Sequence, residues 1–194
     1  MKKIVFASNN SHKVRELRQL LGDGYEVLSL ADIGCNDNIP ETADTFEGNA
    51  LQKAQWVLDR YGLDCIADDS GLEVNALGGA PGVLSARFAG ADHDHEANNN
   101  LLLERLKGCP DRSARFRTVI ALVRKGCDPV FFSGKVDGSI LESRRGSQGF
   151  GYDPLFMPLG WSKSFAEASM EEKNAVSHRG NAVRALVEYL NSKS

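Results

Sequence analysis

The chain has 194 residues, a length typical of one domain and sufficient to bury a core without disulfides or a structural metal. Hydrophobic residues make up 42% and charged residues 25%, which excludes a disordered tail protein, a collagen-like fibre and a coiled coil. The 23 basic and 26 acidic residues leave a net charge of −3, so the sequence offers no electrostatic footprint for duplex DNA or anionic lipid. We therefore expect neither a nucleic-acid partner nor a membrane partner.

The start of the chain and its cysteines favour a cytoplasmic protein. Met1 runs directly into a strand-like segment, which leaves no room for a signal peptide. No apolar run approaches the ~18 residues that a membrane span needs. The four cysteines show no metal-ligand or redox spacing, so we expect reduced, mostly buried thiols and no disulfide framework.

The first part of the chain alternates strand and helix patterns. These patterns predict a strand over residues 2–7, a helix from about 12 to 21, a strand over 25–30, a helix over 46–61 and a short buried strand over 65–67. Asp44 and Glu47 resemble a capping box before the longer helix, and Gly62 follows its end. The short strand is expected to deliver Asp68 and Asp69 at its end.

The second part adds a different strand pattern. Three glycines and a proline make Gly78–Gly82 irregular, and Asp92 is expected to cap a helix that runs to about Lys107. Residues 116–123 and 130–136 are predicted to be antiparallel strands joined by a turn. A capping box at Ser169 begins a helical segment that runs to Tyr189, with a break near Gly180. The predicted fold class is therefore α/β with a mixed sheet.

Lys13 is placed where a helix disfavours a cation. It lies in the first helical turn, next to the partial positive charge of the helix N-terminus. The preceding loop, Ser8–Ser11, joins a strand end to this helix, an arrangement in which backbone N–H groups and a lysine bind phosphate oxygens. The alternative is a solvated Lys13 with Ser11 as the helix cap. The sequence contains no Walker phosphate loop.

Acidic residues provide candidate ligands for magnesium. Asp68 and Asp69 are adjacent in a strand, so their side chains point to opposite faces and at most one faces a given site. The other acidic candidates are Glu41, in a loop next to a proline, and Glu47, at the N-terminus of a predicted helix. A hard cation such as Mg²⁺ prefers a few carboxylates together with substrate phosphates. With Lys13 and Lys53, these acids suggest a magnesium–phosphate site, although each acid alone also suits a cap or a turn.

Two later segments are candidates for binding a nucleobase. Gly149–Pro154 holds aromatic residues in a backbone that glycines make adaptable, which suits stacking on a base but also ordinary loop packing. Lys173, His178 and Arg179 supply donors for carbonyl or phosphate oxygens, with a solvated helix face as the alternative. No Ser-His-Asp or Cys-His arrangement supports nucleophilic catalysis by the protein.

Five separated segments together resemble the inosine triphosphate pyrophosphatase-like family of house-cleaning nucleoside triphosphate pyrophosphatases. They contain, in chain order, Ser8–Asn10 with Lys13 and Glu16, then Glu41 with Thr45–Glu47, Asn49–Ala50 and Lys53–Ala54, then Ala67–Leu72 with Gly78–Gly82 and Ser85–Arg87, then Gly149–Pro154, and last Phe165–Glu167 with Lys173 and Ser177–Arg179. The segments follow the family order across nearly the whole chain.

The resemblance implies a fold and an activity. Members look like an elongated two-lobed α/β fold, with a mixed, curved central sheet flanked by helices and an active site in the cleft between lobes. Residues 1–194 would form one such domain and a homodimer. By similarity, the protein hydrolyses non-canonical purine triphosphates such as ITP, dITP and XTP to the monophosphate and pyrophosphate, which cleanses the nucleotide pool.

The resemblance also assigns roles to individual residues. Asp69 is the implied catalytic base, and Glu41 and Asp69 would hold Mg²⁺. The implied substrate-binding residues are Ser8, Asn9, Asn10, Ser11, His12, Lys13, Lys53, Ser70, Phe150, Gly151, Tyr152, Asp153, Lys173, His178 and Arg179. Two alternatives remain: a Maf-like nucleotide pyrophosphatase with another base preference, and a nucleotide sensor without turnover.

Overall fold

The chain forms two compact units in a computed structural model that describes residues 2–193, apart from the side chains of His12, Glu16 and Leu20. Unit 1 contains the chain up to Asp69, Val119–Ser133 and the chain from Ala182 onward. Unit 2 contains Ser70–Thr118 and Gly134–Asn181. The chain thus passes repeatedly from one unit to the other.

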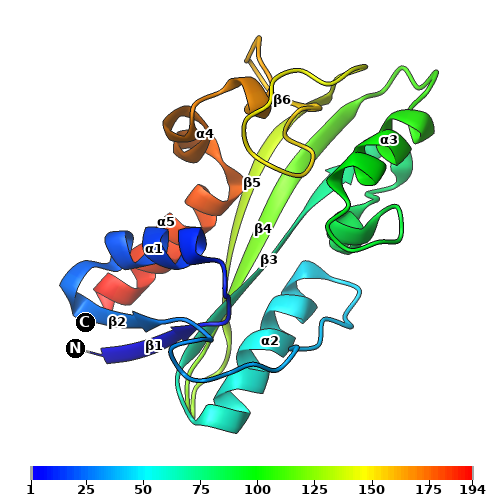
Figure 1. Cartoon of the computed structure of the whole chain (residues 1–194). Helices are drawn as coiled ribbons and strands as arrows, with labels where there is room; N and C mark the ends of the chain where they lie inside the picture. The colour runs from blue at the N-terminus through cyan, green and yellow to red at the C-terminus, as the bar shows by residue number, and fades with distance from the viewer. Residues whose placement is uncertain (1, 194) are drawn as a thin grey trace. The chain divides into compact units, whose positions relative to one another are not determined.

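A single six-stranded sheet has the strand order β2-β1-β3-β4-β5-β6 (Figure 1). The strands are β1 (Lys2–Phe6), β2 (Tyr25–Leu28), β3 (Cys65–Val74), β4 (Ser113–Val123), β5 (Val130–Ile140) and β6 (Phe156–Pro158). Strand β1 is parallel to β2 and to β3, whereas β5 and β6 are antiparallel. The predicted α/β class with a mixed sheet is therefore confirmed.

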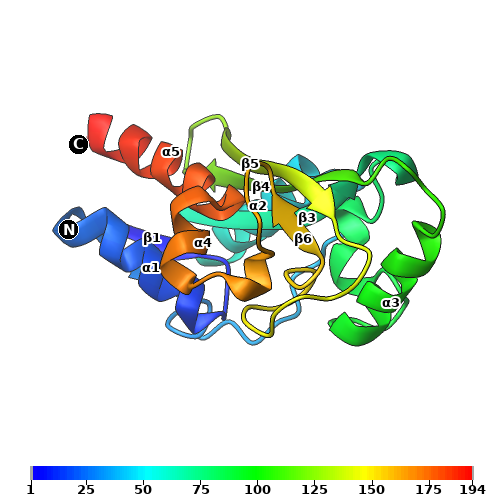
Figure 2. The same ribbon diagram turned by 90° about the horizontal axis from the view of Figure 1, so that it is seen from above.

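In unit 1, side-chain alternation along β1 separates two apolar clusters. Ile4 and Phe6 pack with apolar residues of α1 (Ser11–Leu21) and α5 (His178–Ser192). Val5 and Ala7 pack with α2 (Phe46–Tyr61). Successive strand residues point to opposite faces, so the two clusters cover the two faces of this part of the sheet. Both ends of the described chain lie on the same side of unit 1 (Figures 1 and 2).

Unit 2 is built around a separate apolar cluster. Leu102 and Leu106, in and just after α3 (His95–Arg105), pack with β-strand residues such as Leu72. The rings of Phe116 and Phe156 lie 4.6 Å apart between centroids. This unit also contains the 3₁₀ helix η3 (Gly82–Arg87) and α4 (Met170–Val176). The unit therefore has a core of its own, in which the aromatic residues come from three parts of the chain.

The structure corrects several predicted boundaries. Strand β3 does not end at residue 67 but continues to Val74, because Leu72 and Val74 are fully buried in the unit 2 core. Asp68 and Asp69 therefore lie inside a strand and not at its end. Strand β5 likewise extends to Ile140, beyond the predicted residue 136. The three-residue strand β6 was not predicted, since so short a segment carries no alternation signal.

Three helix ends also differ from the predictions. Thr45, not Asp44, caps α2, and its side chain accepts a hydrogen bond from the backbone N–H of Gly48. Asp94, not Asp92, caps α3, because the intervening His93 has a positive φ of 57° that redirects the chain. The C-terminal helical segment breaks at Ser177 and not at Gly180. The capping box at Ser169 is confirmed.

Within residues 2–193, no helix is long and apolar enough to cross a membrane. The four cysteines are free thiols. Cys35 and Cys65 are buried, whereas Cys109 is partly buried and Cys127 is exposed, so the expectation of mostly buried thiols holds for half of them. Burial raises the pKa of the Cys65 thiol far above its ordinary range, which keeps that thiol protonated.

Candidate functional site

The loop before α1 is organised by its own polar groups. The Asn10 side chain accepts a hydrogen bond from the backbone N–H of Lys13 at 3.3 Å, and Ser8 Oγ accepts one from the backbone N–H of Asn10 at 3.1 Å. Asn10 therefore occupies the cap position that the alternative interpretation gave to Ser11. Asn9 and Ser11 are exposed, and the side chain of His12 lies outside the described part of the structure.

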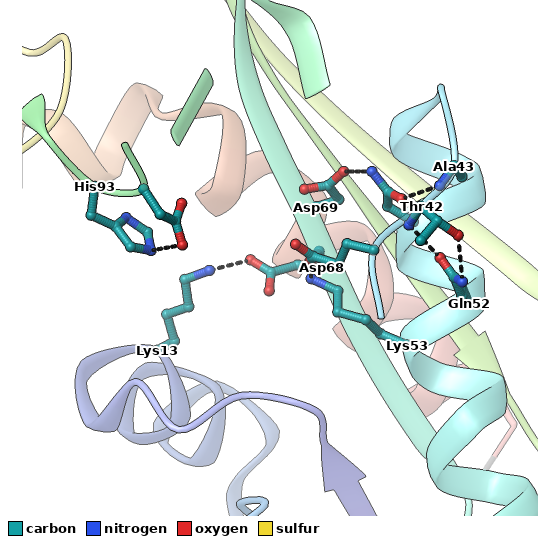
Figure 3. Close-up of polar contacts among 11 residues, drawn as sticks. Lys13, Thr42, Ala43, Gln52, Lys53, Asp68, Asp69 and His93 are labelled. Carbon is teal, nitrogen blue, oxygen red and sulfur yellow. Dashed lines mark hydrogen bonds and ion pairs between the residues drawn. The ribbon is translucent and has the colours of Figure 1, made fainter. Parts of the chain in front are cut away.

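Lys13 is not a solvated lysine. Its Nζ lies 2.8 Å from Oδ2 of Asp68, and the side chains of the two residues are 21% and 4% exposed. A nearly buried carboxylate needs such a partner, because burying an unpaired charge is costly. The ion pair therefore holds the ammonium group of Lys13 beside β3, next to the N-terminus of α1 (Figure 3).

Asp68 and Asp69 contact different helices. Asp68 pairs with Lys13 of α1, whereas Asp69 Oδ2 accepts a hydrogen bond from the side-chain amide of Asn49 in α2 at 3.1 Å (Figure 3). This separation follows from strand geometry, since neighbouring side chains point to opposite faces. The prediction that the two carboxylates face apart is confirmed.

Lys53 of α2 joins these groups to the loop that contains Glu41. Its Nζ donates to the backbone carbonyl of Asp68 at 2.6 Å and forms an ion pair with the Glu41 carboxylate. Burial acts to lower the pKa of Lys53, but the carboxylates of Asp68 and Glu41 outweigh it, so the pKa lies above its ordinary value. Lys53 therefore stays cationic at neutral pH.

Two amide side chains of α2 position the loop after Glu41. Gln52 accepts a hydrogen bond from the backbone N–H of Thr42 at 2.8 Å and donates to its hydroxyl at 2.9 Å. Asn49, only 3% exposed, accepts from the backbone N–H of Ala43 at 2.9 Å while it donates to Asp69. Neither amide was assigned a role from the sequence. Their spacing of three residues on one helical face was the available signal.

The acidic residues of this cluster are candidate magnesium ligands. Within residues 2–193, no group of three or more His, Cys, Asp or Glu side chains is arranged to hold a metal ion. Mg²⁺ does not require such a cage, because it commonly takes one or two protein carboxylates and completes its shell with phosphates and water. Glu41 and Asp69 are hard oxygen donors, so this donor set suits Mg²⁺ bound together with a phosphate-bearing ligand.

In unit 2, a tight turn presents Phe150. The flanking residues Gly149 and Gly151 have positive φ values of 75° and 61°, and the Phe150 side chain is 64% exposed. The Asp153 carboxylate accepts a hydrogen bond from the backbone N–H of Phe150 at 3.1 Å. A Cβ at Gly149 would collide with that carboxylate, so the turn requires glycine there.

Lys173 of α4 completes this second cluster. Its Nζ lies 2.5 Å from Oδ2 of Asp153 and 5.0 Å from the centroid of the Phe150 ring. The carboxylate of Asp153 is thus shared between a buried ion pair and the backbone of the turn. The structure therefore brings together three predicted substrate-binding residues: Phe150, Asp153 and Lys173.

The other predicted residues of unit 2 lie deeper. Tyr152 is 5% exposed, and its hydroxyl donates to the carbonyl of Ser85 at 2.8 Å. Burial raises the pKa of Tyr152, so this hydroxyl stays protonated. His178 begins α5 and stacks on Phe116 with a centroid distance of 5.0 Å, and the half-buried Arg179 follows it. Ser70 shares a hydrogen bond of 2.7 Å with Thr118.

The chain is similar to known proteins over nearly its whole length. The profile of the Ham1 family matches residues 4–189, nearly the whole chain. The chain belongs to the Ham1 family. A dITP/XTP pyrophosphatase of Christiangramia forsetii is 54% identical over 97% of this chain and 98% of its own length. One from Porphyromonas gingivalis is 53% identical over 98% of each chain.

Solved structures of the Ham1 family have the same fold. The Ham1 protein of Staphylococcus aureus superposes with a TM-score of 0.95 at 39% identity and covers 100% of both chains. A nucleoside-triphosphatase, described as a dITP/XTP pyrophosphatase, from Mycobacterium abscessus has a TM-score of 0.84 at 47% identity over 95% of this chain and 98% of its own. These matches confirm the resemblance found in the sequence motifs and favour it over the Maf-like alternative.

Proposed function

We propose that this Ham1 family chain is a dITP/XTP pyrophosphatase, which hydrolyses dITP, XTP and ITP to the nucleoside monophosphate and pyrophosphate. The observation that carries the proposal is the identity of about half of all residues, over nearly the full length, with relatives of that activity. Residues 1–194 act as one catalytic domain, and the enzyme works in the cytoplasm as a homodimer on the free nucleotide pool.

The charged cluster of unit 1 binds the triphosphate. Lys13 and Lys53 provide cations, and the loop Ser8–Ser11 provides N–H groups at the N-terminus of α1, where anions are stabilised. His12, in the first turn of α1, also binds the triphosphate. In the structure, the carboxylates of Asp68 and Glu41 balance both lysines, so an incoming phosphate competes for cations that are already in position.

Glu41 and Asp69 are the residues that would hold Mg²⁺. When bound, the ion would polarise the phosphate and neutralise charge that develops as the bond to the leaving pyrophosphate breaks. Asp69 would also accept a proton from the attacking water as general base. The Asn49 amide holds the orientation of the Asp69 carboxylate, and Lys53 holds Glu41. The protein thus aligns the water and binds the leaving group.

The cluster of unit 2 binds the base. The exposed ring of Phe150 offers a face for stacking, and Gly151, Tyr152 and Asp153 form and support the turn that carries it. Lys173, His178 and Arg179 offer hydrogen-bond donors. Hypoxanthine and xanthine present a carbonyl at position six, whereas adenine presents an amino group there. A donor-lined site therefore accepts the first two bases and rejects adenine. Ser70 contributes a hydroxyl to the nucleotide.

Product analysis tests the proposal directly. Purified enzyme is incubated with a panel of nucleoside triphosphates and Mg²⁺, and the products are separated by anion-exchange chromatography with and without added inorganic pyrophosphatase. We expect monophosphate and pyrophosphate as the first products, with kcat/KM highest for ITP, dITP and XTP, lower for GTP and lowest for ATP. Diphosphate and orthophosphate as first products, or equal rates for ATP and ITP, contradict the proposal.

Further experiments test base selection, turnover and the dimer. Arg179→Ala should reduce the difference in kcat/KM between ITP and ATP. The substitution should lower kcat/KM far more for ITP than for ATP. Tight binding of dITP without any turnover would instead identify the nucleotide sensor named above. Sedimentation velocity at micromolar concentration tests the dimer, for which a single species at the mass of one chain is the contrary result.

A further inference from the structure

Asn99 of α3 connects its helix to the turn that carries Phe150. The residue is 4% exposed, and its side-chain amide donates two hydrogen bonds. One goes to the carbonyl of His95 in the preceding helical turn at 2.8 Å, and the other to the carbonyl of Gly151 at 2.9 Å. Gly151 directly follows Phe150, so the second bond fixes the backbone immediately after the residue with the exposed ring.

The orientation of this amide follows from its surroundings. Two carbonyl oxygens face the Nδ2 position, so a flipped amide would place its oxygen against both of them. In the observed orientation, Oδ1 is buried and has no hydrogen-bond partner among the residues that the structure describes. A buried acceptor without a donor lowers stability. Leucine at this position would avoid that cost but would leave the Gly151 carbonyl without the Asn99 donor, so the asparagine serves the attachment of the turn.

Neighbouring contacts join the same two segments. The ring of His95 lies 6.4 Å from the ring of Phe150, measured between centroids. Arg144, which precedes the turn, contacts the carboxylate of Glu96 at 3.0 Å and the side chain of Asn100 at 2.8 Å. Helix α3 is thus linked to the chain before the turn by Arg144 and to the turn itself by Asn99.

The backbone of Phe150 itself is held by hydrogen bonds within the turn. The backbone N–H of Phe150 donates to Asp153, and the backbone N–H of Asp153 donates to the carbonyl of Phe150 at 3.2 Å. Those bonds close the turn but do not attach it to a helix. Asn99 supplies an attachment to α3, and Lys173 supplies one to α4 through Asp153.

We propose that Asn99 is a positioning residue for base recognition, which sets the orientation of the Phe150 ring by holding the Gly151 carbonyl. The proposal rests on the proposed function, in which Phe150 stacks on the base. It predicts that loss of the Asn99 amide weakens substrate binding without changing the chemical step. Because the ring meets the base equally in the ground state and the transition state, the effect falls on KM and not on kcat.

Steady-state kinetics with a double-mutant cycle tests this role. Asn99→Leu should raise KM for dITP and XTP about fivefold, the size expected for one net hydrogen bond, and leave kcat within about twofold. In a Phe150→Ala background, the same substitution should have no further effect on KM, because it acts through the missing ring. A KM equal to that of the parent enzyme, a parallel loss of kcat, or additive effects in the double mutant overturns the proposal.

Limited proteolysis provides a readout that does not depend on activity. Chymotrypsin cleaves after exposed phenylalanines, and release of the Gly151 carbonyl should speed cleavage at Phe150 severalfold in Asn99→Leu. Asn98→Ala is the matched control, since Asn98 is also buried in α3 but holds Ala89 and Ala86 instead of the turn. Equal acceleration in the control, or none in Asn99→Leu, contradicts the positioning role. Asn99→Ala replaces the leucine variant if circular dichroism shows that the latter does not fold.

The two proposals fail in different ways. If Phe150→Ala alone leaves KM unchanged, base stacking by Phe150 is wrong, and the cleavage rate at Phe150 then decides whether Asn99 holds the turn. If Phe150→Ala raises KM but Asn99→Leu does not, the proposed function stands and the role of Asn99 is wrong.

Discussion

The charged cluster of unit 1 and the aromatic turn of unit 2 are built by different means. The first takes Lys13 from α1, Lys53 from α2 and Asp69 from β3, and only Glu41 comes from a loop. The second takes Phe150 from a turn in which glycines with positive φ and an aspartate fix the backbone. Rigid elements suit groups that must align with a reacting phosphorus, whereas an exposed ring suits contact with a flat base. Changes in the first cluster should therefore lower the rate, alone or together with affinity, whereas changes in the second should act on affinity.

The largest effect is expected from Asp69→Asn. The amide preserves the shape of the side chain but removes the charge that holds Mg²⁺ and accepts a proton. General-base contributions are about 10²–10⁴-fold, so kcat should fall by at least ~10²-fold while nucleotide binding stays measurable by calorimetry. Asp59→Asn, at an exposed position of α2, is the control and should keep full activity. A loss of less than about tenfold in Asp69→Asn means that Asp69 is not the base.

The next largest effect is expected from Lys13→Ala, which should lower kcat and raise KM. The ammonium group is held beside β3 by Asp68 and would meet phosphate oxygens whose charge shifts during bond cleavage. A charge-assisted hydrogen bond contributes about 1.5–3 kcal/mol, so kcat/KM should fall by about 10- to 100-fold. The exposed Lys107 provides the control substitution, which should leave the initial rates at sub-saturating dITP unchanged. Equal kinetics for Lys13→Ala and the control would assign Lys13 a structural role alone.

Phe150→Ala sharpens the contrast between the clusters. Stacking of a base on an aromatic ring contributes about 1–3 kcal/mol, so KM should rise by roughly 5- to 150-fold with kcat little changed. The exposed Phe131 of β5 is the matched control, because it is 43% exposed and belongs to unit 1, whereas the turn belongs to unit 2. If Phe150→Ala lowers kcat as strongly as Asp69→Asn, then the unit 2 cluster does not act on affinity alone.

The smallest expected effect is on thermal stability and its pH dependence, and it involves the N-terminal capping box of α4. The Lys163 ammonium and the backbone N–H of Ser169 hold the pKa of Glu172 below its ordinary value of 4.5. A lowered folded-state pKa contributes stability above the unfolded-state value, and that stability is lost as pH falls through the folded-state value. Glu172→Gln should therefore lower Tm slightly at pH 7, and the difference in Tm from the parent protein should shrink as the pH falls below about 4.5. If the difference in Tm stays constant with pH, the lowered pKa of Glu172 is not its cause.

Local sequence signals were sufficient for much of the fold. The bounds of α2 agree with the prediction at both ends, because the apolar stripe ends at Gly62, which adopts the left-handed conformation that a helix C-terminus favours. Alternation also predicted correctly that Asp68 and Asp69 face apart. Boundaries failed where a distant core decides: β3 continues past two aspartates because Leu72 and Val74 are buried by residues far along the chain.

The sequence by itself determined the family, the residue types of both clusters and the α/β class, since these depend on motif order and on periodicity within short segments. Only the tertiary structure decided the partners: Asp68 for Lys13, Glu41 for Lys53, and Asn49 for Asp69. It also decided that Asn99 reaches Gly151, a residue 52 positions away along the chain. Pairings of this kind depend on which segments a folded core brings into contact, and no local pattern of the chain specifies that.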